Sequence, residues 1–187
     1  MNTFTLHNYK EEPIRYDGTQ LAPHWIYRRF AILGDAIVAF SGPADVPIQH
    51  MVDLEDVGKN APIYSPRMLH FLGEWFVDSL DSGVLLQHLF VCEIYERLME
   101  RGVSGLRRTG NDIYFENRKL SVSIATRSLV SVLFHIGLNI ETEGTPVPTV
   151  GLSEWKIDPF EFADEILERF AVDSAIWRRS RVKVLSR

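Results

Sequence analysis

The residues best suited to chemistry lie in one short stretch, 107–124. This stretch brings cations, amides, a carboxylate and hydroxyls close together: Arg108, Asn111, Asp112, Lys119, Ser121 and Ser123. The sequence KLSVSIA at 119–125 alternates polar and apolar residues, which predicts a strand with Lys119, Ser121 and Ser123 on its polar face. Fixed cations beside polar groups on adjacent strands can bind a carboxylate or a phosphate. The stretch therefore predicts a site for an anionic small molecule.

Three further candidates lie within apolar runs. His135 and Asn139 belong to the run at 130–140, and His70 belongs to the run at 68–80. A neutral imidazole beside Lys119 can act as an acid or a base, so His135 is a candidate catalytic residue. We consider His70 and Asn139 as substrate contacts. The alternative for His135 is a hydrogen-bonded residue inside the sheet.

Acidic residues gather at Asp53, Glu55 and Asp56. Carboxylates are suitable ligands for a hard cation such as magnesium, which makes these residues candidate metal ligands. Their spacing matches no specific metal motif, and a solvated acidic loop is the alternative.

The elements that must position these residues can be outlined from periodicity. Residues 36–40 form a short apolar run typical of a buried strand, and 41–65 predict a long loop. Ser65 and Pro66 then resemble a helix start, followed by apolar residues at helical spacing up to Leu80. A second helix is expected from 85 to 98, ending at Gly102.

Strands are expected at 113–115, 119–125 and 130–140, with a turn at 116–118. Asp158 and Pro159 begin a helix, and a last helical stretch surrounds Trp177. This order favours an α+β fold in which helices pack on a mostly antiparallel central sheet. At 187 residues with 45% hydrophobic residues, the chain predicts a single domain over 1–187.

Composition excludes some classes of function. The net charge of −5 gives no general attraction for nucleic acid or an anionic membrane. The single cysteine, Cys92, excludes an intramolecular disulfide and a cysteine-based zinc site. The polar N-terminus and the lack of a long apolar run predict a cytoplasmic protein. An exposed edge strand and aromatic helices would favour a homodimer.

The stretch 83–140 resembles the catalytic core of biotin and lipoate protein ligases. The resemblance lies in RRTGNDIY at 107–114, NRKLSVSI at 117–124 and FHIGLNI at 134–140, which follow a helix in the family's order. It implies a class II synthetase-like fold. It also implies that Lys119 contacts a substrate carboxylate and an adenylate phosphate, that Asn111 and Asp112 match an asparagine-aspartate pair, and that Arg108 replaces a lysine.

The sequence departs from this family at two places. The glycine- and arginine-rich loop that grips substrate and nucleotide is replaced by DLEDVGKN at 53–60, and no glycine follows Lys119 at short distance. Bare phosphates would be repelled by the acidic loop, so ATP is a candidate cofactor only together with magnesium.

The whole chain also resembles a family named domain of unknown function 366. That resemblance rests on YDGTQL at 16–21, the acidic segment at 53–56 and KLSVSIAT at 119–126. On its strength alone, Asp17 and Gln20 are candidate substrate-binding residues. The name implies no activity.

Three functional hypotheses follow. The first is a protein that binds an anionic, carboxylate-bearing small molecule and catalyses acyl or adenylyl transfer. The second is a non-catalytic relative that binds a carboxylate metabolite, and the third is a dimeric interaction module.

Overall fold

A five-stranded mixed sheet forms the centre of the protein. The computed structural model describes residues 4–185. The strand order is β1-β2-β3-β8-β7, in which only the β1–β2 pair is parallel and the other pairs are antiparallel. The strands are β1 (Thr5–Asn8), β2 (Ala36–Val46), β3 (Ile63–Trp75), β7 (Ser121–Arg127) and β8 (Val132–Glu141). The expected α+β class with a mostly antiparallel sheet is confirmed.

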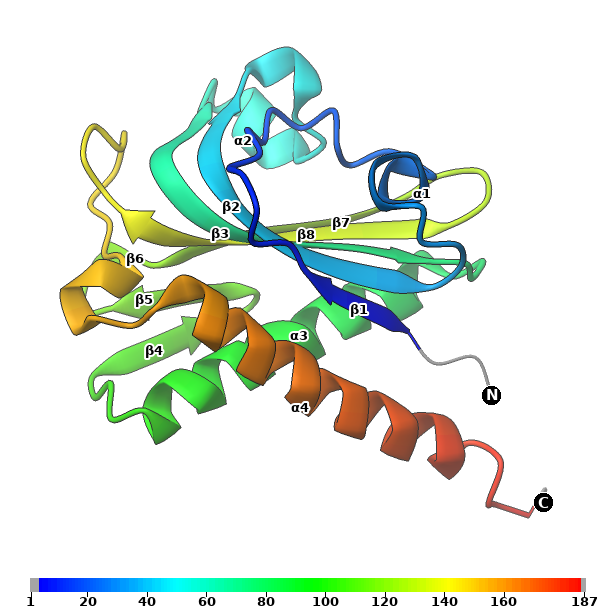
Figure 1. Ribbon diagram of the computed structural model, residues 1–187. Helices are drawn as coiled ribbons and strands as arrows, with labels where there is room; N and C mark the ends of the chain where they lie inside the picture. Colours follow the sequence, from blue (N-terminus) through cyan, green and yellow to red (C-terminus); the bar gives the residue numbers. More distant parts are fainter. Residues whose placement is uncertain (1–3, 186–187) are drawn as a thin grey trace.

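Two long helices cover one face of this sheet (Figure 1). They are α3 (Leu80–Glu100), which packs on β7 and β8, and α4 (Pro159–Ser180), which packs on β1, β2 and β3. Asp158 caps α4 by accepting hydrogen bonds from the backbone N–H groups of Phe160 and Glu161. The main core lies between the sheet and these helices and includes Phe71, Phe90, Phe134 and Phe170.

A small antiparallel sheet of three strands lies beside α3 and next to β7 of the central sheet. Its strands are β4 (Leu106–Thr109), β5 (Asp112–Phe115) and β6 (Arg118–Lys119). Leu106 and Ile113 from this sheet are buried in the main core. The small sheet is thereby fixed to the rest of the molecule.

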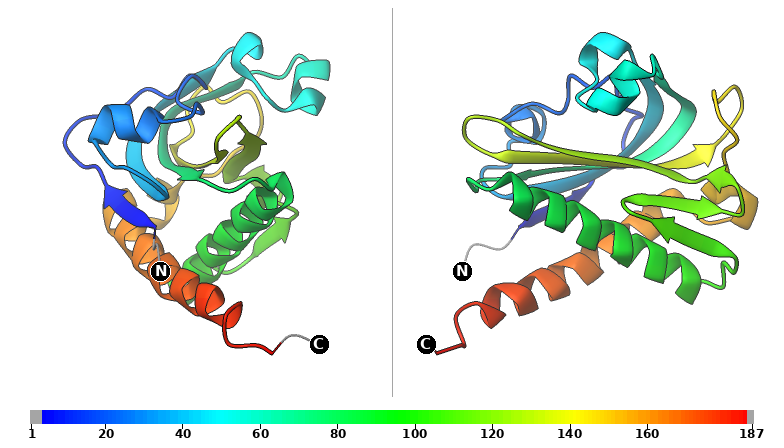
Figure 2. Two further views of the ribbon diagram at one scale, coloured as in Figure 1. Left: turned by 90° about the vertical axis from the view of Figure 1, so that its right-hand side faces the viewer. Right: turned by 180° about the vertical axis from the view of Figure 1, so that it is seen from behind.

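The N-terminal segment covers the opposite face of the central sheet (Figures 1 and 2). It carries α1 (Trp25–Phe30), and the connection from β2 to β3 carries the 3₁₀ turn η1 (Ile48–His50) and α2 (Leu54–Gly58). A second core there contains Val38, Phe40 and Leu72 from the sheet. Another 3₁₀ turn, η2 (Leu152–Trp155), precedes α4. No helix among residues 4–185 is long and apolar enough to cross a membrane.

The helix expected from Ser65 is wrong, because these residues form the long central strand β3. The run from Met68 to Leu72 is buried on both faces of the sheet, so its apolar residues are continuous rather than alternating. Such a run cannot be distinguished from a buried helix by periodicity alone. Pro66 lies beside a register shift at Arg67 and Met68, where a strand tolerates proline.

The surrounding boundaries also differ from those expected. The loop predicted at 41–65 is shorter, because β2 continues to Val46 and β3 begins at Ile63. The two helical stretches expected near the C-terminus are one continuous helix, α4. By contrast, α3 and β8 match the expected helix at 85–98 and the expected strand at 130–140.

The strand expected at 119–125 is interrupted at Leu120, and this changes its faces. Lys119 belongs to β6 in the small sheet, whereas Ser121 begins β7 in the central sheet. Ser121 is fully buried, and its Oγ accepts a hydrogen bond from the backbone N–H of Ile113 at 2.8 Å. Lys119 and Ser121 therefore do not share one solvent-facing strand surface.

Candidate functional site

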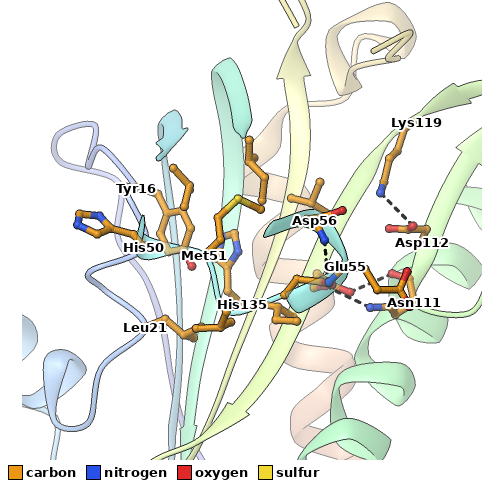
Figure 3. A pocket seen from close by; sticks show the side chains of 18 of the residues that line it. Tyr16, Leu21, His50, Met51, Glu55, Asp56, Asn111, Asp112, Lys119 and His135 are labelled. Atoms are coloured by element: carbon orange, nitrogen blue, oxygen red, sulfur yellow. Dashed lines mark hydrogen bonds and ion pairs between the residues drawn. The ribbon is translucent and has the colours of Figure 1, made fainter. Parts of the chain in front are cut away.

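A cavity of about 480 Å³ lies between the central sheet, the small sheet and the segment around α2. Its wall is built from residues distant in the sequence: Tyr16, Gly18, Leu21, Val46, His50, Met51, Val52, Asp53, Glu55, Asp56, Lys59, Ile63, Asn111, Asp112, Tyr114, Lys119, Val122, Ser123, Ile124 and His135. This volume is suitable for a small metabolite. Figure 3 shows that the charged side chains gather at one end, and Tyr16, Leu21 and His135 at the other.

Lys119 and Asp112 form the centre of the charged end. The Lys119 Nζ lies 2.9 Å from Asp112 Oδ2, and about a quarter of each side chain is exposed. Both residues come from the small sheet, where β5 pairs with β6 across a tight turn at Glu116, whose φ is +54°. Asp112 also accepts a hydrogen bond from the Tyr114 hydroxyl. The ammonium group is thus held in place by the small sheet.

Asn111 and Ser123 connect this end of the cavity to α3. The Asn111 side chain donates to the backbone oxygen of Ser123 at 3.1 Å, and the Ser123 hydroxyl donates to the backbone oxygen of Asn111 at 3.0 Å. Gln87 of α3 donates to the same hydroxyl at 2.7 Å. These bonds fix the small sheet against β7, and they leave both side chains engaged within the protein.

Asp56 of α2 lies near Lys119 and Asp112. Its pKa is raised by burial and by the neighbouring charge of Asp53, while Lys119 and Lys59 lower it in part. Asp53 caps α2, and its carboxylate accepts from the backbone N–H groups of Glu55 and Asp56 at 2.8 and 3.2 Å. The charged end therefore contains more acidic than basic groups, with four carboxylates against two lysines among the described lining residues.

The opposite end contains a stacked pair of rings. Tyr16 and His135 lie with ring centroids 3.8 Å apart and planes 10° from parallel. Burial lowers the pKa of His135 well below its ordinary value, and burial also raises the pKa of the Tyr16 hydroxyl. Both of these rings are therefore uncharged at physiological pH, and His50 also lies at this end, beside Tyr16.

The predicted site residues fall into three groups. Lys119, His135, Asn111, Asp112 and Ser123 line the cavity together, although they come from four different strands and a turn. The predicted metal ligands Asp53, Glu55 and Asp56 line it as well. The described residues contain no group of three or more histidine, cysteine or acidic side chains arranged to hold a metal ion.

Three other predicted residues support the cavity from behind. His70 is fully buried beside His135, and Ser121 is bound to the backbone of β5. The Asn139 side chain donates to the backbone oxygen of Lys119 at 3.2 Å, and Asn139 N–H donates to Leu120. Asn139 therefore holds the backbone of Lys119 where the chain passes between the two sheets.

The remaining predicted residues are outside the cavity. Arg108 is exposed on β4, and its guanidinium donates to the backbone oxygen of Gly110. Asp17 closes a turn by accepting hydrogen bonds from Thr19, and Gln20 bridges Asp17 N–H and the Arg15 carbonyl. Asp17 and Gln20 shape the turn that brings Gly18 to the cavity wall, and they do not line it themselves.

Sequence reasoning missed several lining residues. Tyr16, Met51 and Lys59 lie in segments without regular periodicity, so no pattern assigned them to a site. The alternation places Val122 and Ile124 on the apolar face of the strand, and both are half-buried and line the cavity. The only signal in the sequence was the apolar face of the strand expected at 119–125, because such a face can line a pocket as well as pack in a core.

Comparison with known proteins places the chain in a family. Residues 5–185 match the family described as a domain of unknown function (DUF366). The chain belongs to this family. This DUF366 chain is also similar to an uncharacterised protein of Methanocaldococcus jannaschii, with 33% identity over 88% of this chain and 76% of that protein.

Solved structures extend the comparison to the fold. A protein of unknown function from Pyrococcus horikoshi has a TM-score of 0.94 and 38% identity, covering 99% of this chain and 100% of its own. A T. acidophilum protein described as a candidate lipoate protein ligase has a TM-score of 0.56 and 13% identity, covering 93% of this chain and 86% of its own. The biotin protein ligase of Aquifex aeolicus has a TM-score of 0.51 and 16% identity, covering 91% of this chain and 73% of its own. The DUF366 chain therefore has the biotin/lipoate ligase-like fold that the motif at 107–140 indicated.

Proposed function

We propose that this protein binds a small molecule carrying a carboxylate or phosphate oxyanion, and that Lys119 contacts the oxyanion. The observation that carries the proposal is the position of Lys119, whose ammonium group lines a cavity of about 480 Å³ beside Asp112. A lysine ammonium has three N–H donors. One of them is directed to Asp112 at 2.9 Å, which leaves donors for a ligand oxygen.

The shape of the cavity supports a ligand with two different ends. Apolar side chains of Leu21 and Met51 line the part that lies away from Lys119. An oxyanion at Lys119 would place the body of the ligand against these side chains and the rings beyond them. Most small-molecule sites combine apolar walls with a few positioned polar groups.

Acyl or adenylyl transfer is the reaction that the fold supports. The T. acidophilum relative in fold has also been obtained with bound lipoic acid, at a TM-score of 0.55. Lipoic acid is a carboxylic acid with an apolar body, which is the class of ligand proposed for Lys119. In such a reaction Lys119 would hold the carboxylate and stabilise negative charge that develops on it.

ATP would require magnesium at this site. Four lining carboxylates would repel free phosphates, but one or two carboxylates together with phosphate oxygens are a usual set of magnesium ligands. Asp56 fits this role best, because its raised pKa reflects burial and crowding with Asp53. Asp56 would then hold the metal ion, and Lys119 would remain available for the oxyanion.

A non-catalytic carboxylate-binding protein is the second candidate. The observation that favours it is the acidic lining at Asp53, Glu55 and Asp56, where a nucleotide-using relative needs a cationic or glycine-rich loop. ATP–pyrophosphate exchange stimulated by a bound acid would decide for the enzyme. Binding of the acid without any exchange, in the presence of magnesium, would decide for the binding protein.

The test of the binding proposal is a comparison of Lys119 variants. Thermal-shift and calorimetric titrations would use octanoate, lipoate, biotin and ATP with magnesium as probes. Lys119→Met retains the apolar stem but removes the charge, and we expect it to weaken binding of the responding acid by tenfold or more. The double variant Lys119→Met/Asp112→Asn avoids an unpaired carboxylate and should show the same loss.

Arg108→Gln is the matched control. Arg108 belongs to the same small sheet but lies outside the cavity, so its removal should leave binding within about twofold. Equal affinity of the wild type and Lys119→Met for the responding acid would contradict the proposal. A larger loss in Arg108→Gln than in Lys119→Met would place the oxyanion outside this cavity.

A further inference from the structure

Three polar groups form a hydrogen-bonded row across the central sheet. The His70 Nε2 lies 3.2 Å from the backbone oxygen of Gly42, and His70 Nδ1 lies 3.0 Å from His135 Nε2. The row runs from β2 through β3 to β8. It ends at His135, which lines the cavity.

Both imidazoles in this row are neutral at physiological pH. His70 is completely buried, and burial lowers its pKa to about 4. Burial also lowers the pKa of His135 well below its ordinary value, and the neighbouring His70 adds to the effect. Each ring therefore carries one proton, and its position can be derived from the hydrogen bonds.

The carbonyl of Gly42 determines the direction of the whole row. A carbonyl oxygen only accepts hydrogen bonds, so His70 Nε2 carries the proton of its ring. Nδ1 of the neutral His70 is then an acceptor, and His135 Nε2 must donate to it. Since His135 has only one ring proton, its Nδ1 carries a free lone pair. Among residues 4–185, the hydrogen bond of the His135 ring is the one from Nε2 to His70.

The orientation of His135 is fixed by packing as well as by hydrogen bonding. Tyr16 stacks on one face of the His135 ring at 3.8 Å, and Tyr16 also lies near His70, with ring centroids 5.3 Å apart. Phe40 stacks on His70 at 4.9 Å. Rotation of either ring would break both a stack and a hydrogen bond. The Nδ1 acceptor is therefore preorganised before any ligand arrives.

We propose that Nδ1 of His135 is a built-in hydrogen-bond acceptor for the ligand, and that the ligand bound at Lys119 carries a neutral ring N–H at its other end. The inference rests on the proposed function, because Lys119 sets the position of the oxyanion. The two features lie at opposite ends of the cavity (Figure 3). The ligand class is thus a carboxylate joined to a flat ring with an N–H donor.

The surroundings of His135 favour a ligand whose N–H donor is neutral and belongs to a flat ring. Tyr16 and Leu21 provide aromatic and apolar surface at this end, Ile124 lies opposite His135 on the paired strand, and Asp112, Glu55 and Asp56 lie at the other end. A cationic donor would lose its hydration without meeting an opposite charge. An N–H group on a neutral ring loses less hydration free energy, and His135 Nδ1 is already in place to accept its hydrogen bond. His135 acts here as a hydrogen-bond acceptor, because burial lowers its pKa and favours the neutral ring.

The first test concerns the protein without ligand. Long-range ¹H–¹⁵N NMR at pH 7 distinguishes protonated from bare imidazole nitrogens, and His70→Gln and His135→Gln provide the assignments. We expect both rings to carry their proton on Nε2. A proton on Nδ1 of His135, or a doubly protonated ring, would overturn the inference whatever ligand is later identified.

The second test compares two probes that differ by one donor. Indole-3-propionate carries a carboxylate and a ring N–H, and its benzofuran analogue replaces the N–H by an oxygen atom. We expect calorimetry to show about tenfold tighter binding of the indole, because His135 Nδ1 accepts from the indole N–H and has no donor to pair with in the benzofuran. In His135→Phe this preference should disappear, while the dependence on Lys119 persists.

The outcomes separate this inference from the proposed function. Equal affinity for the two probes, or binding of octanoate without binding of either ring acid, would overturn the ring N–H assignment and leave Lys119 as the oxyanion contact. Loss of all acid binding would overturn the proposed function and the ligand class with it. If His135→Phe does not fold, as judged by circular dichroism, the NMR tautomer and the wild-type probe pair still decide.

Discussion

Buried polar side chains in this protein are of two kinds. Glu74 is buried but fully engaged, because its carboxylate accepts from the backbone N–H of His24 and from the Ser131 hydroxyl at 2.7 Å. Glu93 on α3 is equally buried, yet neither of its carboxyl oxygens has a hydrogen-bond partner among the described residues. The first kind stabilises a connection between segments, and the second costs stability whenever it is ionised.

Replacement of Glu93 by glutamine should stabilise the protein at neutral pH. Burial, with a contribution from Asp173, raises the pKa of Glu93 from 4.5 to about 8. Between these pH values the unfolded chain releases the proton and the folded chain retains it, so stability falls as pH rises. We expect Glu93→Gln to raise the free energy of unfolding by about 2 kcal/mol at pH 7, and to have no advantage near pH 4.

Urea denaturation at pH 4, 7 and 8 measures this effect. The exposed Glu168 on α4 provides the matched control, since Glu168→Gln should change stability by less than about 0.5 kcal/mol at each pH. A Glu93→Gln variant that is no more stable than the wild type at pH 7 would show that Glu93 is ionised without penalty in the folded protein.

At the scale of elements, β3 connects the two halves of the molecule. It pairs with β2 on one side and with β8 on the other, and residues on its two faces belong to the two cores. Its partner β8 carries His135 toward the cavity and Phe134 toward the helices. The position of the cavity floor therefore depends on close packing between these two strands.

Gly73→Ala should disturb this packing. A Cβ at Gly73 would lie 2.1 Å from ring atoms of Phe134, which is fully buried and cannot move away freely. We expect a loss of about 1–3 kcal/mol in the free energy of unfolding, measured by chemical denaturation. Gly58→Ala is the control, since a Cβ at Gly58 would meet no atom within 4 Å. Equal stability of the two variants would mean that β3 and β8 separate at little cost.

At the scale of the whole molecule, one core joins the two sheets. Ile113 of the small sheet is fully buried in the main core, and its backbone oxygen accepts from Leu120 N–H at 2.9 Å. The strands that carry Asp112 and Lys119 are therefore attached to the central sheet by burial and by hydrogen bonds. Folding of the site and folding of the domain should be a single cooperative event.

Ile113→Ala tests this cooperativity. The truncation should lower stability by about 2–4 kcal/mol and lower the melting temperature of the entire protein, followed by calorimetry. Ile176→Ala, at a position that is 58% exposed, should change it by less than about 0.5 kcal/mol. A separate low-temperature transition in Ile113→Ala would contradict the prediction, because it would show the small sheet unfolding on its own.

The sequence by itself determined the elements that depend on local signals. Asp158 and Pro159 begin α4, the apolar stripe ending at Gly102 specifies α3, and the motif from Arg107 to Ile140 indicated the fold. These signals are readable because caps, helical periodicity and turns involve neighbours in the chain. The same signals failed for β3, where burial on both faces removes the alternation that marks a strand.

Only the tertiary structure decided which residues meet at the site. Lys119 and Asp112 were expected together, but Arg108 does not line the cavity, and Tyr16 reaches it from more than a hundred residues away from Lys119 along the chain. The stacking of Tyr16 on His135, and the row from Gly42 through His70, depend on pairing between β2, β3 and β8. Contacts between distant segments arise from the sheet order, and no local spacing encodes that order.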